Sequence, residues 1–204
     1  MVGGLIRIAL GALMASILRT TAQGGTGSTP GTPFHYFKLL VKHFEGYYKN
    51  WYKCPAGYWT IGYGHVREDE DPVPWSISEH EASEMLREEY EKTYLPAAVN
   101  ALEAQGIDVE SMPAHHLGAI VSGVYNLGPQ IVVDGSWVDF YKDKDMGTAG
   151  QRWYLWSKHK DPGTGKLIRS KGLVRRRFSE WYMLKTGTFE PNVRGYEAWY
   201  ENHQ

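Results

Sequence analysis

One four-residue segment, Cys54-Pro55-Ala56-Gly57, most constrains the fold of this 204-residue chain. Proline suits the second position of a type I turn because its ring fixes φ, and glycine is favoured at the fourth. The flanking runs, residues 47–53 and 58–63, are rich in aromatic residues that favour β-strands. The pattern therefore predicts a small β-hairpin.

A helix is expected immediately before this hairpin. Apolar residues recur from Phe34 to Phe44 at intervals of three and four, which is the spacing of a helix with one buried face, and Gly46 is a plausible stop. Glu45 then lies in the last helical turn, at the negative end of the helix dipole. Both that position and the apolar neighbour Phe44 favour a protonated carboxyl group, as a general acid requires. The alternative is a solvated glutamate, which the helix alone favours.

The rest of the chain reads as mainly helical. Ser78 and Glu81 form a capping box that opens a helix to about Thr93, and Pro96 should break or restart it. Further helices are expected over residues 112–128, 148–158 and 173–185, with Gly172 and Gly187 marking the boundaries of the last one. The predicted fold class is therefore α+β, with one small β-hairpin lobe and a larger, mainly helical lobe.

The N-terminal region differs from the rest. An eleven-residue apolar run, Ile8 to Leu18, lies between Arg7 and Arg19, which is shorter than the ~20 residues of a normal spanning helix. We expect residues 1–23 to be signal-like or weakly membrane-inserting; an amphipathic or disordered leader is the alternative. Residues 24–33, rich in glycine, serine, threonine and proline, read as a flexible linker before a folded part at 34–204.

The distribution of charge and of possible metal ligands excludes few classes of function. The formal net charge is −1, and the single cysteine excludes an internal disulfide. Residues 142–185 contain twelve basic and four acidic residues; this excess could attract a cell-wall polymer, nucleic acid or lipid headgroup, or be a solvated face. His115 and His116 are adjacent, so they do not share a helix face, and we expect no metal site there. No cofactor is predicted.

The spacing of three residues around the hairpin carries more chemistry. Eight residues separate Glu45 from Cys54, and five separate Cys54 from Thr60, so a helix end and a tight hairpin could bring all three to one cleft. Hydrolysis of a glycosidic bond requires an acid for the leaving oxygen and a second group that positions or activates water. Thr60 can hold such a water, whereas Cys54 taken alone reads as a packing residue near the turn.

With these residues in view, the stretch "FEG…YKCPAGYWTIGYGH" closely resembles the phage-type lysozymes, the endolysins of glycoside hydrolase family 24. Their motif is Glu, eight residues, Asp or Cys, five residues, Thr. The helices "SISEHEASEMLREEY" and "GAIVSGVYNLG" and the segment "GLVRRRFSEWYML" are similar to later parts of the family, so the resemblance spans roughly residues 34–185. Arg176, Arg177 and Glu180 in that last segment read as an internal salt-bridge network.

The resemblance implies a lysozyme-like fold, with a β lobe at about 46–75 and a helical lobe at about 76–190. It also implies hydrolysis of the β-1,4 bond between N-acetylmuramic acid and N-acetylglucosamine. Glu45 would be the general acid, Thr60 would orient water, and Cys54 would take the place of the second catalytic carboxylate. The same resemblance suggests substrate contacts for a second group of residues. These are Tyr63, His65, Tyr125 and Asn126.

Two other functions stay open from the sequence. A lytic transglycosylase acts on the same bond and needs an acid but no water-positioning partner, and a wall-binding virion module could keep the fold without activity. For an endolysin, we expect peptidoglycan as partner, no nucleic acid, a monomer, and transient inner-membrane association through a signal-arrest-release type of leader. Synthesis in the host cytoplasm and action in the host periplasm or cell wall would follow.

Overall fold

The computed structural model describes residues 29–54, 57–67 and 73–203. The predicted leader at 1–23 and the first half of the predicted linker at 24–33 lie outside the described residues. The helices run in chain order as follows: α2 (Pro33–Glu45), α3 (Glu79–Glu89), the π-helical η1 (Tyr90–Tyr94), α4 (Leu95–Ala104), α5 (Ala114–Leu127), α6 (Gln130–Val133), α7 (Trp137–Lys142), α8 (Met146–Tyr154), α9 (Lys171–Thr186) and α10 (Tyr196–Glu201). The strands are β1 (Tyr48–Lys53), β2 (Trp59–Gly62), β3 (His65–Val66), β4 (Lys158–Lys160) and β5 (Leu167–Arg169).

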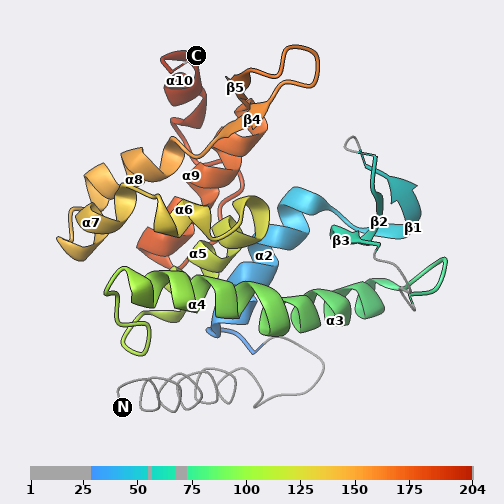
Figure 1. Ribbon diagram of the computed structural model, residues 1–204. Helices are drawn as coiled ribbons and strands as arrows, with labels where there is room; N and C mark the ends of the chain where they lie inside the picture. Colours follow the sequence, from blue (N-terminus) through green and yellow to red (C-terminus); the bar gives the residue numbers. More distant parts are fainter. Residues whose placement is uncertain (1–28, 55–56, 68–72, 204) are drawn as a thin grey trace, which may run out of the picture.

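The predicted hairpin is present as β1 and β2, which pair antiparallel and continue into β3. The backbone closes where the turn was expected, because Gly57 N donates to Cys54 O at 2.8 Å and Cys54 N donates to Tyr58 O at 2.9 Å. Residues 55 and 56 lie outside the described part, so the turn type stays a prediction. Figure 1 shows this sheet at one side of the molecule, beyond the end of α2.

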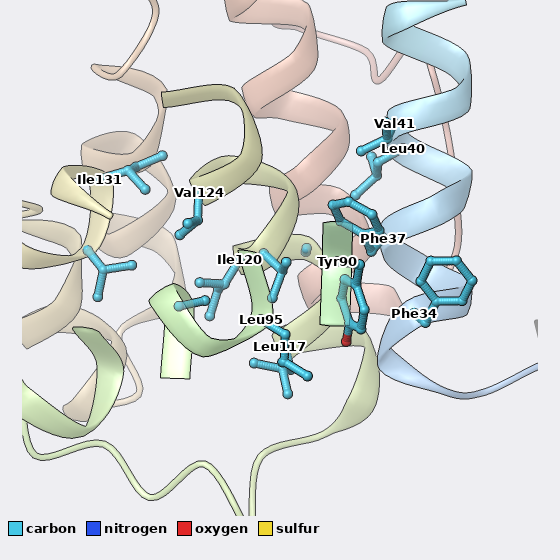
Figure 2. Packing of buried hydrophobic residues seen from close by; sticks show 14 of the residues in the cluster. Phe34, Phe37, Leu40, Val41, Tyr90, Leu95, Leu117, Ile120, Val124 and Ile131 are labelled. Atoms are coloured by element: carbon cyan, nitrogen blue, oxygen red, sulfur yellow. The ribbon is translucent and has the colours of Figure 1, made fainter. Parts of the chain in front are cut away.

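The helix before the hairpin is confirmed as α2, which begins after the N-cap Thr32 and is followed by Gly46. Its apolar face packs into the main core against α5, and Figure 2 shows Phe34, Phe37, Leu40 and Val41 lying on this side. Burial of such side chains contributes roughly 1.5–3 kcal/mol each. This packing fixes the direction of α2, and with it the position of Glu45 at its last turn.

Pro96 restarts the helix, which is one of the two outcomes predicted for it, and the predicted capping box of Ser78 and Glu81 is confirmed. The helix continues from α3 through η1 into α4, which together cross the molecule as one long rod (Figure 1). In η1 the bonding lengthens by one residue, and Leu95 N donates to Tyr90 O. Pro96 follows in the first turn of α4, where a missing N–H is tolerated. The proline therefore restarts the helix without interrupting it.

The C-terminal part differs from its predicted pattern in three ways. Helix α8 ends at Tyr154, and a two-stranded β4–β5 hairpin follows where a helix to residue 158 was expected. Gly172 lies inside α9 and does not mark its start. Helix α10 was not predicted; it buries Trp199 against Val174 and Phe178 of α9. Local glycine and proline signals in residues 162–165 could have indicated the hairpin turn.

The fold class itself is confirmed. Small antiparallel sheets accompany a larger helical body, and one main hydrophobic core connects the β1–β3 sheet to α2, α3 and α5. Within the described residues, no helix combines the length and apolar character needed to span a bilayer.

Candidate active site

Glu45 is the last residue of α2, and its side chain is 28% exposed. Its Oε1 accepts a hydrogen bond from Arg176 Nη1 at 2.5 Å. Arg176 comes from α9, and only 4% of its side chain is exposed. The candidate acid therefore lies at the junction of α2 with α9, with one carboxyl group still reachable from solvent.

This contact opposes the influences expected from the helix end. The sequence argument weighed only the dipole of α2 and the apolar Phe44, and both disfavour a negative charge at Glu45. The structure adds a guanidinium in direct contact with the carboxyl group, and that cation also lies 5.6 Å from the centre of the Phe44 ring. An adjacent cation stabilises a carboxylate. The site thus combines charges that act in opposite directions on the same group.

Arg176 also belongs to a buried polar network centred on Glu180, which is fully buried. Four side chains donate to its two carboxylate oxygens at 2.7–3.2 Å: Ser122, Trp153, Arg176 and Arg177. The predicted internal salt-bridge network is therefore confirmed. A buried ion pair that loses one partner typically destabilises a protein by several kcal/mol, which makes this network a rigid support for Arg176.

The register of the hairpin places Cys54 and Thr60 on one face. Tyr52 pairs with Thr60, and Cys54 N bonds to Tyr58 O, so these four side chains share a face while Lys53 and Trp59 share the other. Thr60 is 4% exposed, and its hydroxyl donates to Tyr58 O at 3.3 Å. The shared face therefore brings a thiol and a threonine hydroxyl together, as the spacing predicted.

Two observations bring this face close to Glu45. Burial raises the pKa of Tyr52, with smaller contributions from Tyr48, Cys54 and Glu45, so the Tyr52 hydroxyl lies in the field of both candidate catalytic groups. A Cβ placed on Gly64, after β2, would lie 3.9 Å from Glu45 Cγ. The helix end and the hairpin lobe are therefore in close contact beside the acid.

Among the residues predicted to bind substrate, Tyr63 and Tyr125 bond to neighbouring elements. Tyr63 is 3% exposed, and its hydroxyl donates to Glu79 Oε1 at 2.6 Å. Tyr125 Oη donates to Tyr63 O at 2.6 Å, and burial raises the pKa of Tyr125 well above its ordinary value. The two tyrosines thereby connect α5 and α3 to the hairpin lobe, and their contact with a sugar stays a prediction.

The other two predicted residues, His65 and Asn126, bond to different elements. His65 Nδ1 lies 2.5 Å from Glu89 Oε1 of α3, and the His65 side chain is 21% exposed. Asn126 Oδ1 accepts from Arg177 Nη2 at 3.1 Å, which joins it to the buried network. A pocket of about 490 Å³ adjoins Gly64 and His65 and extends over Met85 and Glu88 of α3. Only His65 among the predicted substrate-binding residues lines this pocket.

Two residues of the site were missed by the sequence interpretation in their present roles. Arg176 was predicted as part of an internal network and not as a partner of Glu45, since residues 131 positions apart carry no local signal of their contact. Tyr52 was not singled out, although alternation along β1 places it on the same face as Cys54. Within the described residues, no cluster of three or more histidine, cysteine or acidic side chains is arranged to hold a metal ion.

Comparisons with known proteins agree with this geometry. Residues 42–180 match the family model described as phage lysozyme. The endolysin of Acyrthosiphon pisum secondary endosymbiont phage 1 is 31% identical over 142 residues, covering 70% of this chain and 90% of that protein. The endolysin of Bacillus phage B103 is 29% identical over 150 residues, covering 72% of this chain and 52% of that protein.

A solved structure extends the likeness to the fold. The endolysin from Escherichia coli O157:H7 phage FAHEc1 superposes with a TM-score of 0.64 at 28% identity, covering 76% of this chain and 94% of that one. The matched region contains Glu45, Cys54, Thr60 and Arg176, the residues of the candidate site. The chain therefore belongs to the phage lysozyme family, and a peptidoglycan-lytic function of the muramidase type follows from that membership.

Proposed function

We propose that this protein is an endolysin that hydrolyses the β-1,4 bond between N-acetylmuramic acid and N-acetylglucosamine. The observation that carries the proposal is the meeting of Glu45 with the hairpin lobe, beside a hairpin face that holds both Cys54 and Thr60. A glycosidase needs an acid on one side of the scissile bond and a water-directing group on the other. This arrangement supports the proposal because it would bring both kinds of group to the junction of α2 with the hairpin lobe.

In the proposed reaction, Glu45 gives its proton to the bridging oxygen as the bond to the anomeric carbon breaks. A water molecule adds to that carbon and releases one proton to solvent, and Glu45 takes up one proton from solvent, so that two sugar ends are formed and the acid is restored. Arg176 holds the Glu45 carboxyl group in position, while its bond to Glu180 keeps Arg176 itself in place. Positioning of this kind is a large part of the catalytic contribution of a general acid.

Thr60 and Cys54 are proposed to act on the water. The Thr60 hydroxyl has its own acceptor in Tyr58 O, and its oxygen can still accept a hydrogen bond from a water proton. Cys54 occupies the position of the second carboxylate. A thiol of ordinary pKa, near 8.5, is mostly protonated at neutral pH and is then a weaker base than a carboxylate. We therefore assign the larger part of water orientation to Thr60.

Lytic transglycosylation of the same bond is the second candidate, because a cysteine in place of an aspartate weakens the assistance to water. Product analysis on purified cell walls separates the two reactions. New reducing ends are expected for hydrolysis, and 1,6-anhydro ends would reject it in favour of the alternative. Failure of the wild-type protein to clear walls under any tested condition would contradict both enzymatic assignments and favour a wall-binding module.

The cellular setting belongs to the same proposal. An endolysin made in the host cytoplasm reaches its substrate in the periplasm or cell wall, and residues 1–23 are proposed to assist through transient inner-membrane association. Residues 34–204 would form the monomeric catalytic part, with a β lobe at about 46–75 and a helical lobe at about 76–190. Fusion of residues 1–33 to a periplasmic reporter tests the leader separately from catalysis.

A further inference from the structure

A second pocket lies at the opposite end of the helical body from Glu45. It has a volume of about 590 Å³ and is lined by the segment between α4 and α5, the start of α5, the segment around α7, and the end of α9. His116 and Lys185 line it, and each lies nine residues along its own helix from a residue of the candidate active site, Tyr125 and Arg176 respectively. At 1.5 Å per residue, that separation is roughly 13 Å along each helix.

Three lysines from two separate segments line this pocket: Lys142, Lys144 and Lys185. Lys142 Nζ lies 3.0 Å from Asp139, so part of its charge is already compensated. Within the described residues, neither Lys144 nor Lys185 has a carboxylate within 4.0 Å. Asp108 is the single acidic residue of the lining, so the lining together with the Asp139 partner of Lys142 carries a formal charge of +1.

Lys144 adopts a backbone conformation that is unusual for lysine. It is the one residue other than glycine with positive φ, at 60°, in the part of the chain that the structure describes. Lys144 N donates to Tyr141 O and Asp145 N donates to Phe140 O, which are the two bonds that end a helix around a left-handed residue. Glycine is the favoured residue at such a position, because a Cβ there is strained. A lysine at this position makes the fold less stable than a glycine would, and it places an ammonium group at the pocket.

The pocket also offers a surface for more than a simple ion. His116 Nδ1 and Tyr141 Oη are 2.8 Å apart, which fixes both rings in the lining. Apolar side chains, including Ile107, Met112 and Met146, complete it. A volume of this size is in the range of small-molecule sites. Inorganic phosphate alone would leave most of the space and the whole apolar surface without contact.

We propose that this pocket binds a phosphate ester of a polyol or sugar, with Lys144 and Lys185 contacting the phosphate. The side of the pocket that is lined by His116 and Tyr141 contacts the carbon skeleton. Lys144 and Lys185 have no carboxylate partner among the described residues, and a phosphate monoester, which carries close to two negative charges at neutral pH, offers enough oxygen atoms to contact both ammonium groups. Lysine ammonium groups are common phosphate ligands. The inference is independent of the proposed reaction at Glu45, because it concerns binding at a separate pocket.

Titration of the full-length protein with glycerol 3-phosphate, followed by calorimetry, tests the proposal. Saturable binding is expected for the wild type, and Lys144→Gly and Lys185→Gln should each weaken it at least fivefold. Lys158→Gln removes an exposed lysine of β4 and serves as the matched control, with unchanged affinity. Lys144→Gly should also raise the melting temperature, since glycine relieves the backbone strain, so weaker binding cannot be attributed to unfolding.

Several results would overturn the proposal. The site would be rejected if the wild type showed no saturable binding, or if Lys144→Gly and Lys185→Gln bound as tightly as the wild type. Equal affinity for inorganic phosphate and glycerol 3-phosphate would reject the polyol contact, and binding of glycerol would reject the role of charge. If the site holds, co-sedimentation with phosphatidylglycerol vesicles that is lost in Lys144→Gly assigns the ester to a lipid headgroup. Binding of the soluble ester without co-sedimentation assigns it to a wall polymer or a metabolite.

Discussion

Arg176 Nη1 of α9 lies 2.5 Å from Glu45 Oε1 at the end of α2, and the same guanidinium donates through Nε to the buried Glu180 at 3.2 Å. One arginine thus connects the candidate acid to the most buried polar network of the helical body. The position of Glu45 depends on packing around α9, far from it in the chain. Substitutions at the site can therefore be chosen to separate loss of chemistry from loss of structure.

Glu45→Gln is expected to abolish wall clearing while the protein stays folded. Glutamine keeps the shape of the side chain and an oxygen that accepts from Arg176, but it has no proton to donate as an acid. The rate should fall by about 10²–10⁴-fold, the usual contribution of a general acid. Turbidity reduction of purified walls measures the rate, and thermal unfolding measures stability. Glu197→Gln, at an exposed ion pair with Lys171, is the matched control and should clear walls normally. Clearing by Glu45→Gln at the wild-type rate would reject the assignment.

Cys54→Asp should retain activity, because it restores the carboxylate that the resemblance places at this position. Cys54→Ala should lose most of it, at least about tenfold, since alanine neither accepts a proton nor orients water. The same turbidity assay across pH 5–9 compares the variants with the wild type. Full activity of the alanine variant at every pH would show that Cys54 is a packing residue beside the turn.

Thr60→Val separates the hydroxyl from the packing of Thr60. Valine has nearly the same shape, and the buried position loses one hydrogen bond to Tyr58 O, with a stability cost of about 1 kcal/mol. If Thr60 orients water, the rate should fall by roughly 10–100-fold, well beyond what that loss of stability explains. Thr60→Ser keeps a hydroxyl and should recover much of the rate. A valine variant with wild-type turnover would remove Thr60 from the mechanism.

Gly64→Ala should damage both stability and activity. Gly64 has φ of 104°, and a Cβ there would lie 2.4 Å from Tyr125 Oη, the group that joins α5 to the hairpin lobe. Backbone strain and this clash together should reduce the free energy of unfolding by roughly 2–4 kcal/mol. Gly195→Ala is a fitting comparison, because Gly195 also has a positive φ, of 92°, but a Cβ added there would meet no atom within 4 Å. Equal losses of stability in the two variants, measured by denaturant unfolding, would show that the Tyr125 contact is unimportant.

The sequence was most informative where the fold is determined locally. The helix to Glu45, the capping box at Ser78 and the hairpin around Cys54 are all confirmed, because each depends on residues within a few positions of one another. Alternation along the two strands also makes it predictable that Cys54 and Thr60 share a face.

Prediction failed where distant packing decides. The contact of Arg176 with Glu45 joins residues 131 positions apart, and no periodic pattern reports such a pair. Pro96 restarts the helix as one of its two predicted outcomes, but the π-helical turn η1 that precedes it within the long rod was not predicted. The hydrogen bond from the Tyr63 hydroxyl to Glu79 joins residues of two different elements and was also not predicted, while the sugar contact expected of Tyr63 stays a prediction. Local signals thus located the catalytic candidates but did not reveal what holds them in place.

Acid should weaken the fold through His116. Burial, with a smaller effect of His115, lowers the pKa of His116 to about 4, below its ordinary value of 6.5. The unfolded chain therefore takes up a proton at higher pH than the folded one, and stability falls as pH decreases from about 6.5 to about 4. Because much of the ring is solvent-accessible, we discount the full linkage value to about 1–2 kcal/mol.

His116→Gln keeps a polar partner for Tyr141 Oη and cannot be protonated in this range. Melting temperatures measured from pH 7.5 to 4 should therefore fall less steeply in this variant than in the wild type, with the difference confined to that window. Parallel curves would show that His116 is solvated enough to titrate normally in the folded state.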